Sequence, residues 1–302
     1  METVLVAEQV AVLAVLMAIG YLGTKKNFIN ESISRGMTSI LTNIALPALI
    51  ISSFNMTYSK ETLKGILLIF VFSLGVHIFN ALAVKLFYKK YSKGKNEVLR
   101  FGTIFPNSGF MGLPLIYELF GQEAALYGSV FMIPYHTMIW TYGESILAKE
   151  KGDSSIKKLA KTPALTAIII GTILFALKIQ MPYVLSKSFS MLSSLTSPLS
   201  MLILGEKIAK LSFKEIVGDK DIYYGCFVKL IVIPIISLVI LNIIKAPDLL
   251  KNVVVFMQSL PTAILLVVLT QKHEGDIEFA SKFTVISHMV SVLTIPLISL
   301  LL

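Results

Sequence analysis

The residues best placed for binding chemistry lie in one short stretch, Phe105 to Leu115, which reads Phe-Pro-Asn-Ser-Gly-Phe-Met-Gly-Leu-Pro-Leu. Its two prolines and two glycines are incompatible with an ordinary helix, because proline removes a backbone donor and clashes with the preceding turn. The flanking residues are apolar enough to cross a membrane, where every released backbone group needs a partner. A break of this kind is tolerated where it lines a cavity, and it points to the binding site of a transporter.

A second apolar segment, residues 250–271, is also interrupted by polar residues and a proline. If the two broken helices meet near the middle of the membrane, their ends direct partial charges into one small volume. The half-helices that begin after the breaks then offer free N–H groups, which suits an anion. Purely structural kinks are the alternative interpretation. The candidate substrate-binding residues at the two breaks are Pro106, Asn107, Ser108, Ser259, Pro261 and Thr262.

The composition is that of a polytopic helical membrane protein. Of the 302 residues, 55% are hydrophobic and 15% are charged, against about 25% charged residues in soluble domains. The single cysteine, Cys226, excludes a disulfide framework and a Cys-based metal site. No nucleophile with a positioned base, no paired carboxylates and no phosphate-binding glycine loop is present. We therefore expect no enzymatic activity, no cofactor and no metal.

Windows of about 20 apolar residues predict ten membrane-spanning helices, the first of which is a retained span and not a cleaved signal peptide. The predicted windows are 3–23, 36–56, 65–88, 97–120, 124–148, 162–181, 187–207, 222–244, 250–271 and 277–301.

The basic residues predict the orientation of these helices. With the N-terminus outside, 18 Lys and Arg residues fall at inside loops and helix ends and 6 fall outside, so N-out and C-out is favoured. The formal charge of +9 is then explained by topology and anionic lipid. A nucleic-acid partner is not expected, because no loop is long enough to carry a basic module. We expect a multi-pass protein of the cell membrane.

Proline positions indicate an internal repeat. Three pairs follow in order with offsets of 151, 155 and 162 residues. Five helices on either side of a polar loop force the two halves into opposite orientations, as in many secondary transporters. The predicted units are residues 1–148, a cytoplasmic connecting loop at 149–162, and residues 163–302. The pairs are Pro47 with Pro198, Pro106 with Pro261, and Pro134 with Pro296.

The stretch from Pro106 to Pro114 resembles the helix 4 crossover of the auxin efflux carrier family, and the resemblance covers essentially the whole chain. Leu260-Pro261-Thr262, Asn43 to Pro47 and Ser197-Pro198-Leu199 are similar to further parts of that family. The connecting loop of about fourteen residues favours a compact bacterial-type member of the malate-permease-like branch, related to the plant PIN carriers.

The resemblance implies two inverted five-helix repeats with broken helices 4 and 9 that cross at their prolines. Helices 1, 2, 6 and 7 would form a scaffold, and helices 3–5 and 8–10 a mobile transport domain. It also implies organic anion substrates, such as malate or related carboxylates in bacterial members and indole-3-acetate in plant members. The short loop argues against auxin as the physiological substrate.

Three kinds of polar residue inside the predicted spans need an explanation. Lys229 lies among apolar residues about seven positions into its helix, and we interpret it as an internal cation that braces the crossover or replaces a coupling ion. Snorkelling to an interface is the alternative. Asn43 either faces the substrate or satisfies backbone released by Pro47. The histidines are expected to pack rather than to bind a ligand, and they are His77, His136 and His288.

The sequence therefore predicts a secondary transporter of small organic anions that works by alternating access, with Asn107 the best side chain for the carboxylate. Uniport or anion exchange is favoured over ion-driven transport, because acids within the membrane are few. One alternative is a sodium-coupled symporter of the bile-acid type, and another is a membrane-embedded sensor or receptor module. A homodimer stays open.

Overall fold

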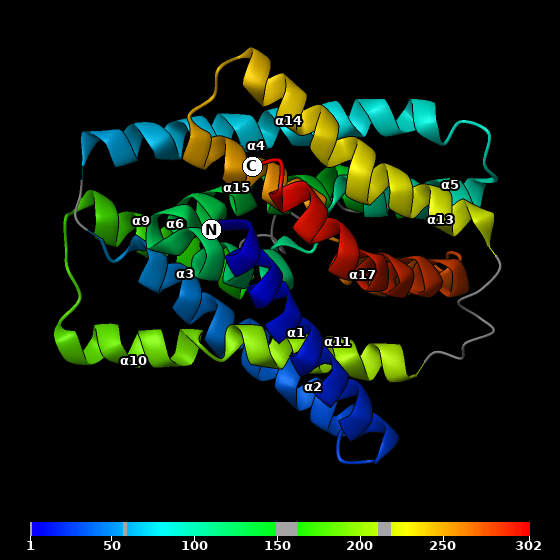
Figure 1. The fold of residues 1–302 in the computed structure, drawn as a ribbon, viewed down its shortest axis with the longest axis horizontal. Helices are drawn as coiled ribbons and strands as arrows, with labels where there is room; N and C mark the ends of the chain where they lie inside the picture. Colours follow the sequence, from blue (N-terminus) through cyan, green and yellow to red (C-terminus); the bar gives the residue numbers. More distant parts are fainter. Residues whose placement is uncertain (1, 57–58, 149–161, 211–218) are drawn as a thin grey trace.

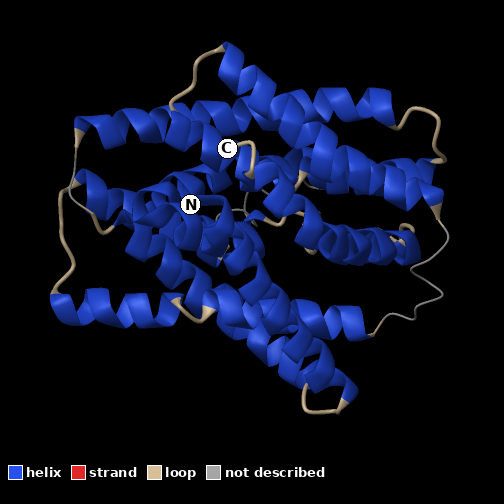
Figure 2. Ribbon diagram, viewed as in Figure 1, coloured by secondary structure: helices blue, strands red, loops and turns tan. Residues whose placement is uncertain are grey.

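The computed structural model describes residues 2–56, 59–148, 162–210 and 219–302, and helices account for the regular structure of these ranges except for one isolated β-bridge (Figures 1 and 2). Here η denotes a short π-helical turn. The elements are α1 Glu2–Lys25, α2 Glu31–Ile40, η1 Leu41–Ala45, α3 Leu46–Phe54, α4 Lys60–Phe87, α5 Lys93–Ile104, η2 Ser108–Gly112, α6 Leu113–Met138, η3 Ile139–Gly143, α7 Glu144–Leu147, α9 Pro163–Ala176, α10 Tyr183–Ser193, α11 Thr196–Ala209, α13 Lys220–Phe227, η4 Val228–Val232, α14 Ile233–Ile243, α15 Asp248–Ser259, α16 Leu265–Lys272 and α17 Ile277–Ser299.

Five helical segments in the described ranges are long and apolar enough to cross a membrane, which confirms an all-α protein with several membrane-length helices. The predicted fourth and ninth spans are each divided at a break. The ten-span inverted repeat stays a prediction, and positions 149–161 of the predicted connecting loop lie outside the described residues. The five segments are Glu31–Phe54, Lys60–Phe87, Tyr183–Ala209, Lys220–Ile243 and Ile277–Ser299.

Three of the π-helical turns have the same local cause. Each precedes a helix that carries proline in its first turn, namely Pro47, Pro114 and Pro234. The proline ring clashes with the carbonyl four residues earlier, so the turn before it widens. The N–H of the residue just before each proline then reaches back five residues instead of four. Leu46 N–H, for example, donates to the Leu41 carbonyl. The backbone thereby stays paired without water, as a membrane requires.

Gly121 divides α6 into two arms. Its φ of 81° and ψ of −172° lie in a region that residues with a Cβ rarely adopt. The predicted spans 97–120 and 124–148 are thus separated at a glycine turn within α6.

The two ends of the molecule differ in charge. The turn between α4 and α5, the end of α11 and the start of α13 lie together at the right of Figure 1. We call this the basic end, because it carries Lys89, Lys90, Lys93, Lys207 and Lys220. The opposite end, where α3 stops and α4 and α10 begin, is called the far end.

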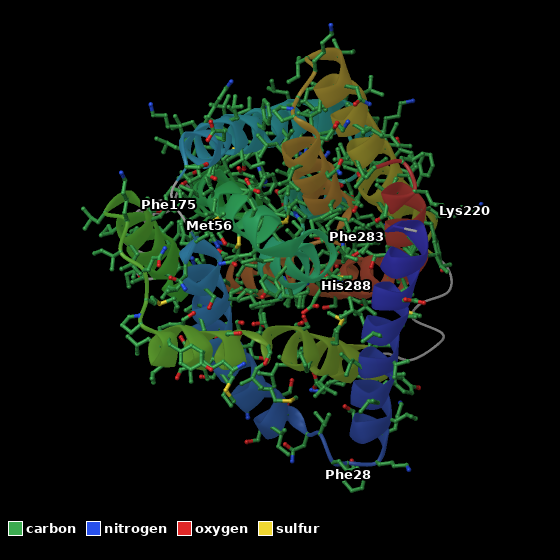
Figure 3. The ribbon with its side chains drawn as sticks, turned by 60° about the vertical axis from the view of Figure 1, so that its left-hand side comes forward. Phe28, Met56, Phe175, Lys220, Phe283 and His288 are labelled. Atoms are coloured by element: carbon green, nitrogen blue, oxygen red, sulfur yellow. The ribbon has the colours of Figure 1, made fainter. Side chains whose placement is uncertain are left out.

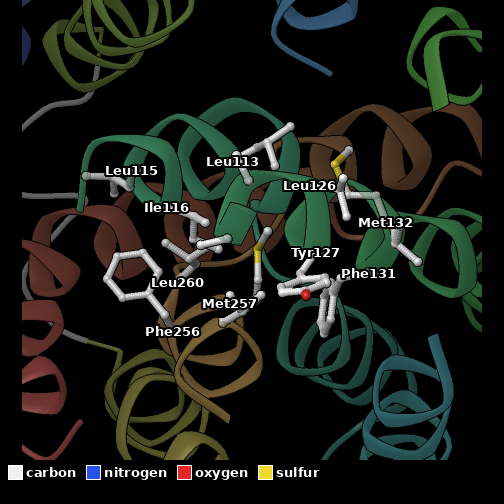
Figure 4. Close-up of a cluster of buried hydrophobic side chains, with 14 of the residues drawn as sticks. Leu113, Leu115, Ile116, Leu126, Tyr127, Phe131, Met132, Phe256, Met257 and Leu260 are labelled. Carbon is white, nitrogen blue, oxygen red and sulfur yellow. The ribbon is translucent and has the colours of Figure 1, made fainter. Parts of the chain in front are cut away.

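Two large apolar clusters form most of the core of the described residues, and Leu41, Ala45 and Ile203 form a small third one. The first cluster is drawn from α1, α3, α4, α6, α9, α11, α14, α15 and α17. Near the breaks it packs Leu113 and Ile116 of α6 against Met257 of α15 and Leu260 just after that helix, as Figure 4 shows. The second cluster draws its buried residues from α4 to α7, from α13, α14, α16 and α17, and from the π-helical turns and break residues beside them.

Candidate substrate site

The two broken helices cross through their backbones. Pro106 and Thr262 form an isolated antiparallel β-bridge. Asn107 N–H donates to the Pro261 carbonyl at 2.8 Å, and Ala263 N–H donates to the Phe105 carbonyl at 2.9 Å. Backbone groups that the breaks in the helices leave unpaired are therefore bonded to each other. The C-terminal ends of α5 and α15 thus meet at this crossing in the interior.

A histidine holds the Asn107 side chain in place. His288 Nδ1 lies 2.7 Å from the Thr284 carbonyl, which can only accept, so Nδ1 carries the proton. His288 Nε2 is then the acceptor for Asn107 Nδ2 at 3.1 Å. Both side chains are buried, and Figure 3 places His288 in the interior among the packed helices. The sequence prediction of a packing role for His288 is therefore incomplete, because His288 also orients Asn107.

Asn107 lines a cavity of about 340 Å³ beside the crossing. The first residues of both half-helices, Gly109, Phe110, Ile264 and Leu265, line it as well. The first N–H groups of a helix have no partner inside that helix and carry a partial positive charge. The other lining residues are Thr38, Thr42, Leu46, Met132, Tyr135, His136, Ile139, Trp140, Thr162, Pro163, Ala164, Ala263 and Val268.

The other residues predicted at the breaks lie around the crossing without lining this cavity. Pro106 and Pro261 supply the backbone of the crossing. Ser108, Ser259 and Thr262 are buried. Ser259 Oγ donates to the Phe256 carbonyl, and Thr262 N–H donates to Ser287 Oγ. These two bonds stabilise the break, whereas the buried hydroxyls of Ser108 and Thr262 have no hydrogen-bond partner among the described residues.

Asn43 lies away from the cavity on an exposed face. Its Nδ2 donates to the Ser39 carbonyl at 2.9 Å, one turn earlier. The Ser39 carbonyl is not the one that Pro47 releases, which is that of Asn43 itself, so both predicted roles of the Asn43 side chain stay predictions.

Lys229 is fully buried, so snorkelling to an interface does not describe it. Its Nζ donates to the Gln258 backbone carbonyl at 3.2 Å, one residue before α15 ends at Ser259. A helix C-terminus carries partial negative charge, which an ammonium offsets. Asn80 Nδ2 donates to the Gln258 side-chain Oε1 at 2.9 Å. Lys229 therefore contacts the second broken helix on the α15 side of the crossing.

Sequence reasoning did not assign a binding role to His136 or Trp140, although both line the cavity. Their spacing of four residues puts them on one helix face, directly after Pro134, and this pattern was available in the sequence. Within the described ranges, no group of three His, Cys, Asp or Glu side chains could hold a metal ion.

The fold and site are those of a membrane transport protein. A family model with that description matches residues 5–299, so the chain belongs to this family, which is that of the auxin efflux carriers. The resemblance drawn from the crossover motif is confirmed.

Particular relatives carry the same general name. An uncharacterized transporter of Methanocaldococcus jannaschii is 27% identical over 301 residues, which cover 95% of this chain and 96% of that protein. An uncharacterized transporter of Methanothermobacter thermautotrophicus is 25% identical, with 98% of each chain covered. The uncharacterized transporter YfdV of Escherichia coli is 22% identical over 75% of each chain. The family description therefore makes this chain a membrane transport protein.

Proposed function

We propose that this protein is a secondary transporter of small organic anions, with the carboxylate bound at the crossing of the broken helices. The observation that carries the proposal is the placement of Asn107 and two half-helix starts on one cavity. A carboxylate there accepts hydrogen bonds from the Asn107 amide and from backbone N–H groups, while the helix dipoles offset its charge.

The two clusters support an alternating-access mechanism. The cavity lies on the side of the crossing nearer the basic end, since Trp140 leads into α7, which contacts α5. The first cluster fills the space beyond the breaks toward the far end. This conformation gives access from one side, and movement of one group of helices against the other would exchange the open side.

The proposed architecture assigns these groups. Ten spans in two inverted repeats would place α1 to α3 and α9 to α11 in a scaffold, and α4 to α7 and α13 to α17 in a transport domain. The second cluster supports this division, because its buried residues come from the proposed transport domain alone. The protein would lie in the cell membrane with both termini outside, and a homodimer is compatible with this arrangement.

The central test compares Asn107→Ala with Asn242→Ala, a matched substitution at an exposed asparagine of α14. A thermal-shift screen of carboxylates on purified protein identifies ligands, and flux is then measured in proteoliposomes. We expect Asn107→Ala to weaken binding at least tenfold, because a hydrogen bond to a charged group contributes about 1.5–3 kcal/mol. Asn242→Ala should bind normally.

Unchanged binding by folded Asn107→Ala would overturn the assignment of the crossing as the carboxylate site. Binding without flux in wild-type liposomes would instead favour the sensor or receptor module.

The orientation is tested by cysteine labelling at the two ends of α4, in a Cys226→Ser background. Lys60→Cys at the far end should react with an impermeant maleimide added outside intact cells, and Ser92→Cys at the basic end should react only after the membrane is permeabilised. Both positions are suited to labelling, because Lys60 and Ser92 are exposed. The reverse pattern would place the basic end outside and contradict the predicted topology.

A further inference from the structure

A second cavity lies at the basic end, where α4 stops and where α5 and α13 begin (Figure 1). Its volume is about 680 Å³, against about 340 Å³ for the cavity at the crossing. The two cavities share no lining residue, so the proposed transport site makes no use of this one. Its lining combines three lysines with two tyrosines and apolar side chains.

The second cavity lies at the depth of the lipid headgroups. The 28 residues of α4 extend over about 42 Å at helical rise, which matches a bilayer of about 40–45 Å including its headgroups. The cavity is lined by Leu86 and Phe87, the last two residues of that helix. Tyr91 and Tyr224 line it with stacked rings whose centroids are 6.3 Å apart, and tyrosine is enriched at this membrane boundary.

The charged side chains at this cavity leave two lysines for a ligand. Lys95 is already paired, because its Nζ lies 2.5 Å from Asp221 and 3.0 Å from Asp219. Lys89 and Lys90 are exposed, and neither has an ion-pair partner among the described residues. Three lysines against two aspartates leave one net positive charge, which the single negative charge of a phosphodiester neutralises.

An apolar surface continues from the cavity toward the middle of the membrane. Leu86 lines the cavity and is 80% exposed, and Leu82, one turn deeper on α4, is 61% exposed. On α13, Phe227 follows the lining residue Tyr224 by three positions and is 54% exposed. Exposed apolar surface of this kind suits acyl chains. A ligand that carries both a phosphate and acyl chains therefore matches the whole surface, whereas a soluble phosphate matches the lysines alone.

We infer that this cavity binds the headgroup of an anionic phospholipid, whose acyl chains lie along α4 and α13. Lys89 and Lys90 attract the phosphate, since basic pockets between helices at the membrane boundary bind anionic headgroups. A zwitterionic lipid binds more weakly, because its own quaternary ammonium offsets its phosphate. The inference does not depend on the carboxylate site at the crossing, which is formed by other residues.

Native mass spectrometry of the full-length protein in detergent tests this site with two lipids that have the same acyl chains. We expect one copy of phosphatidylglycerol to bind about tenfold more tightly than phosphatidylcholine. Glycerophosphoglycerol, which is the same headgroup without acyl chains, should not bind at millimolar concentration. Equal affinity for the two lipids would overturn the inference. Binding of glycerophosphoglycerol as tight as that of the lipid would overturn it as well, and would assign the cavity to soluble phosphate esters.

Lys89→Met/Lys90→Met removes both free charges and keeps side chains of similar length. In this variant the preference for phosphatidylglycerol over phosphatidylcholine should fall to less than about threefold. The matched control is Lys25→Met/Lys26→Met, because these two lysines are also adjacent and exposed, at the end of α1 and outside the cavity. The control should keep the full preference.

An equal loss of preference in the two double variants would show general attraction between the basic end and anionic lipid, and it would overturn the assignment of a site. The comparison of the two lipids on the wild-type protein tests the inference even if a variant does not fold.

Discussion

The two apolar clusters of this protein differ in the helices that they join. Toward the far end, the first cluster packs α3, α9 and α11 directly against α6, which in turn packs against α15. Toward the basic end, the second cluster has no buried member from α1, α2, α3, α9, α10 or α11. The cavity there lies between α2, α3 and α9 on one side and α6 and α16 on the other. Apolar contact thus connects the two groups of helices at the far end, while the cavity separates them toward the basic end. In this conformation the far end is closed, because the apolar surfaces of the first cluster exclude water there.

The largest expected effect comes from fixing the contact at the far end. Ser53 Oγ of α3 and Ser129 Oγ of α6 lie 3.2 Å apart, close enough for cysteines to form a disulfide. In a Cys226→Ser background, oxidised Ser53→Cys/Ser129→Cys should lose at least tenfold in liposome flux, and a reductant should restore it. The physical reason is that the bond prevents the two groups from separating there.

The matched control joins α3 to α10 within one group. Asn55 Nδ2 donates to Ser186 Oγ at 3.1 Å, and because this amide nitrogen lies one bond beyond the position of a cysteine sulfur, Asn55→Cys/Ser186→Cys is bridged with a short bifunctional thiol reagent. This cross-link should leave flux within about twofold of the unbridged protein. Full flux in the cross-linked Ser53→Cys/Ser129→Cys protein would show that the far end does not open during transport.

Lys229→Met gives the second prediction and tests whether the second cluster needs its buried cation. A buried ammonium with little compensation is costly, and its replacement by an apolar residue of similar length is often neutral or stabilising. We expect an unchanged or higher melting temperature together with about a tenfold loss of flux. Lys85→Met, at an exposed lysine of α4, is the control and should change neither quantity markedly. Wild-type flux in Lys229→Met would remove the functional role of Lys229.

The smallest expected effect concerns the outer edge of the second cluster. Lys95 Nζ lies 2.5 Å from Asp221 and 3.0 Å from Asp219, and these carboxylates raise the pKa of Lys95. A partly exposed pair of this kind contributes at most about 1 kcal/mol. Because the folded pKa is raised, the contribution is complete below the ordinary lysine pKa of about 10.4 and disappears as pH rises through the folded value.

Lys95→Met should therefore lower the melting temperature slightly at pH 8, and the difference from the wild-type protein should shrink above about pH 10.4. A difference that persists unchanged at alkaline pH would indicate that packing of the lysine stem, not its charge, stabilises this edge.

The breaks were predictable from sequence because proline and glycine act locally. Pro106, Pro114 and Pro261 restrict their own backbone wherever the chain folds, and Asn107 follows directly from that pattern. The partners of these residues were not predictable. His288 orients Asn107 from 181 positions away, and Lys229 reaches the carbonyl of Gln258 across two elements. Asn43 was a candidate for substrate contact, but its side chain bonds to Ser39 of its own helix and does not line the cavity. Which face of a helix meets the cavity depends on packing between helices, which the sequence pattern does not determine.

The backbone crossing has a consequence for divergence within the family. Both hydrogen bonds of the crossing join main-chain atoms, so their formation does not depend on the side chains that surround them. Mutations in the cavity wall can therefore accumulate without loosening the joint. Relatives at 22–27% identity are expected to share this backbone crossing while binding chemically different substrates. Similarity of fold between two members therefore says little about whether they transport the same substrate.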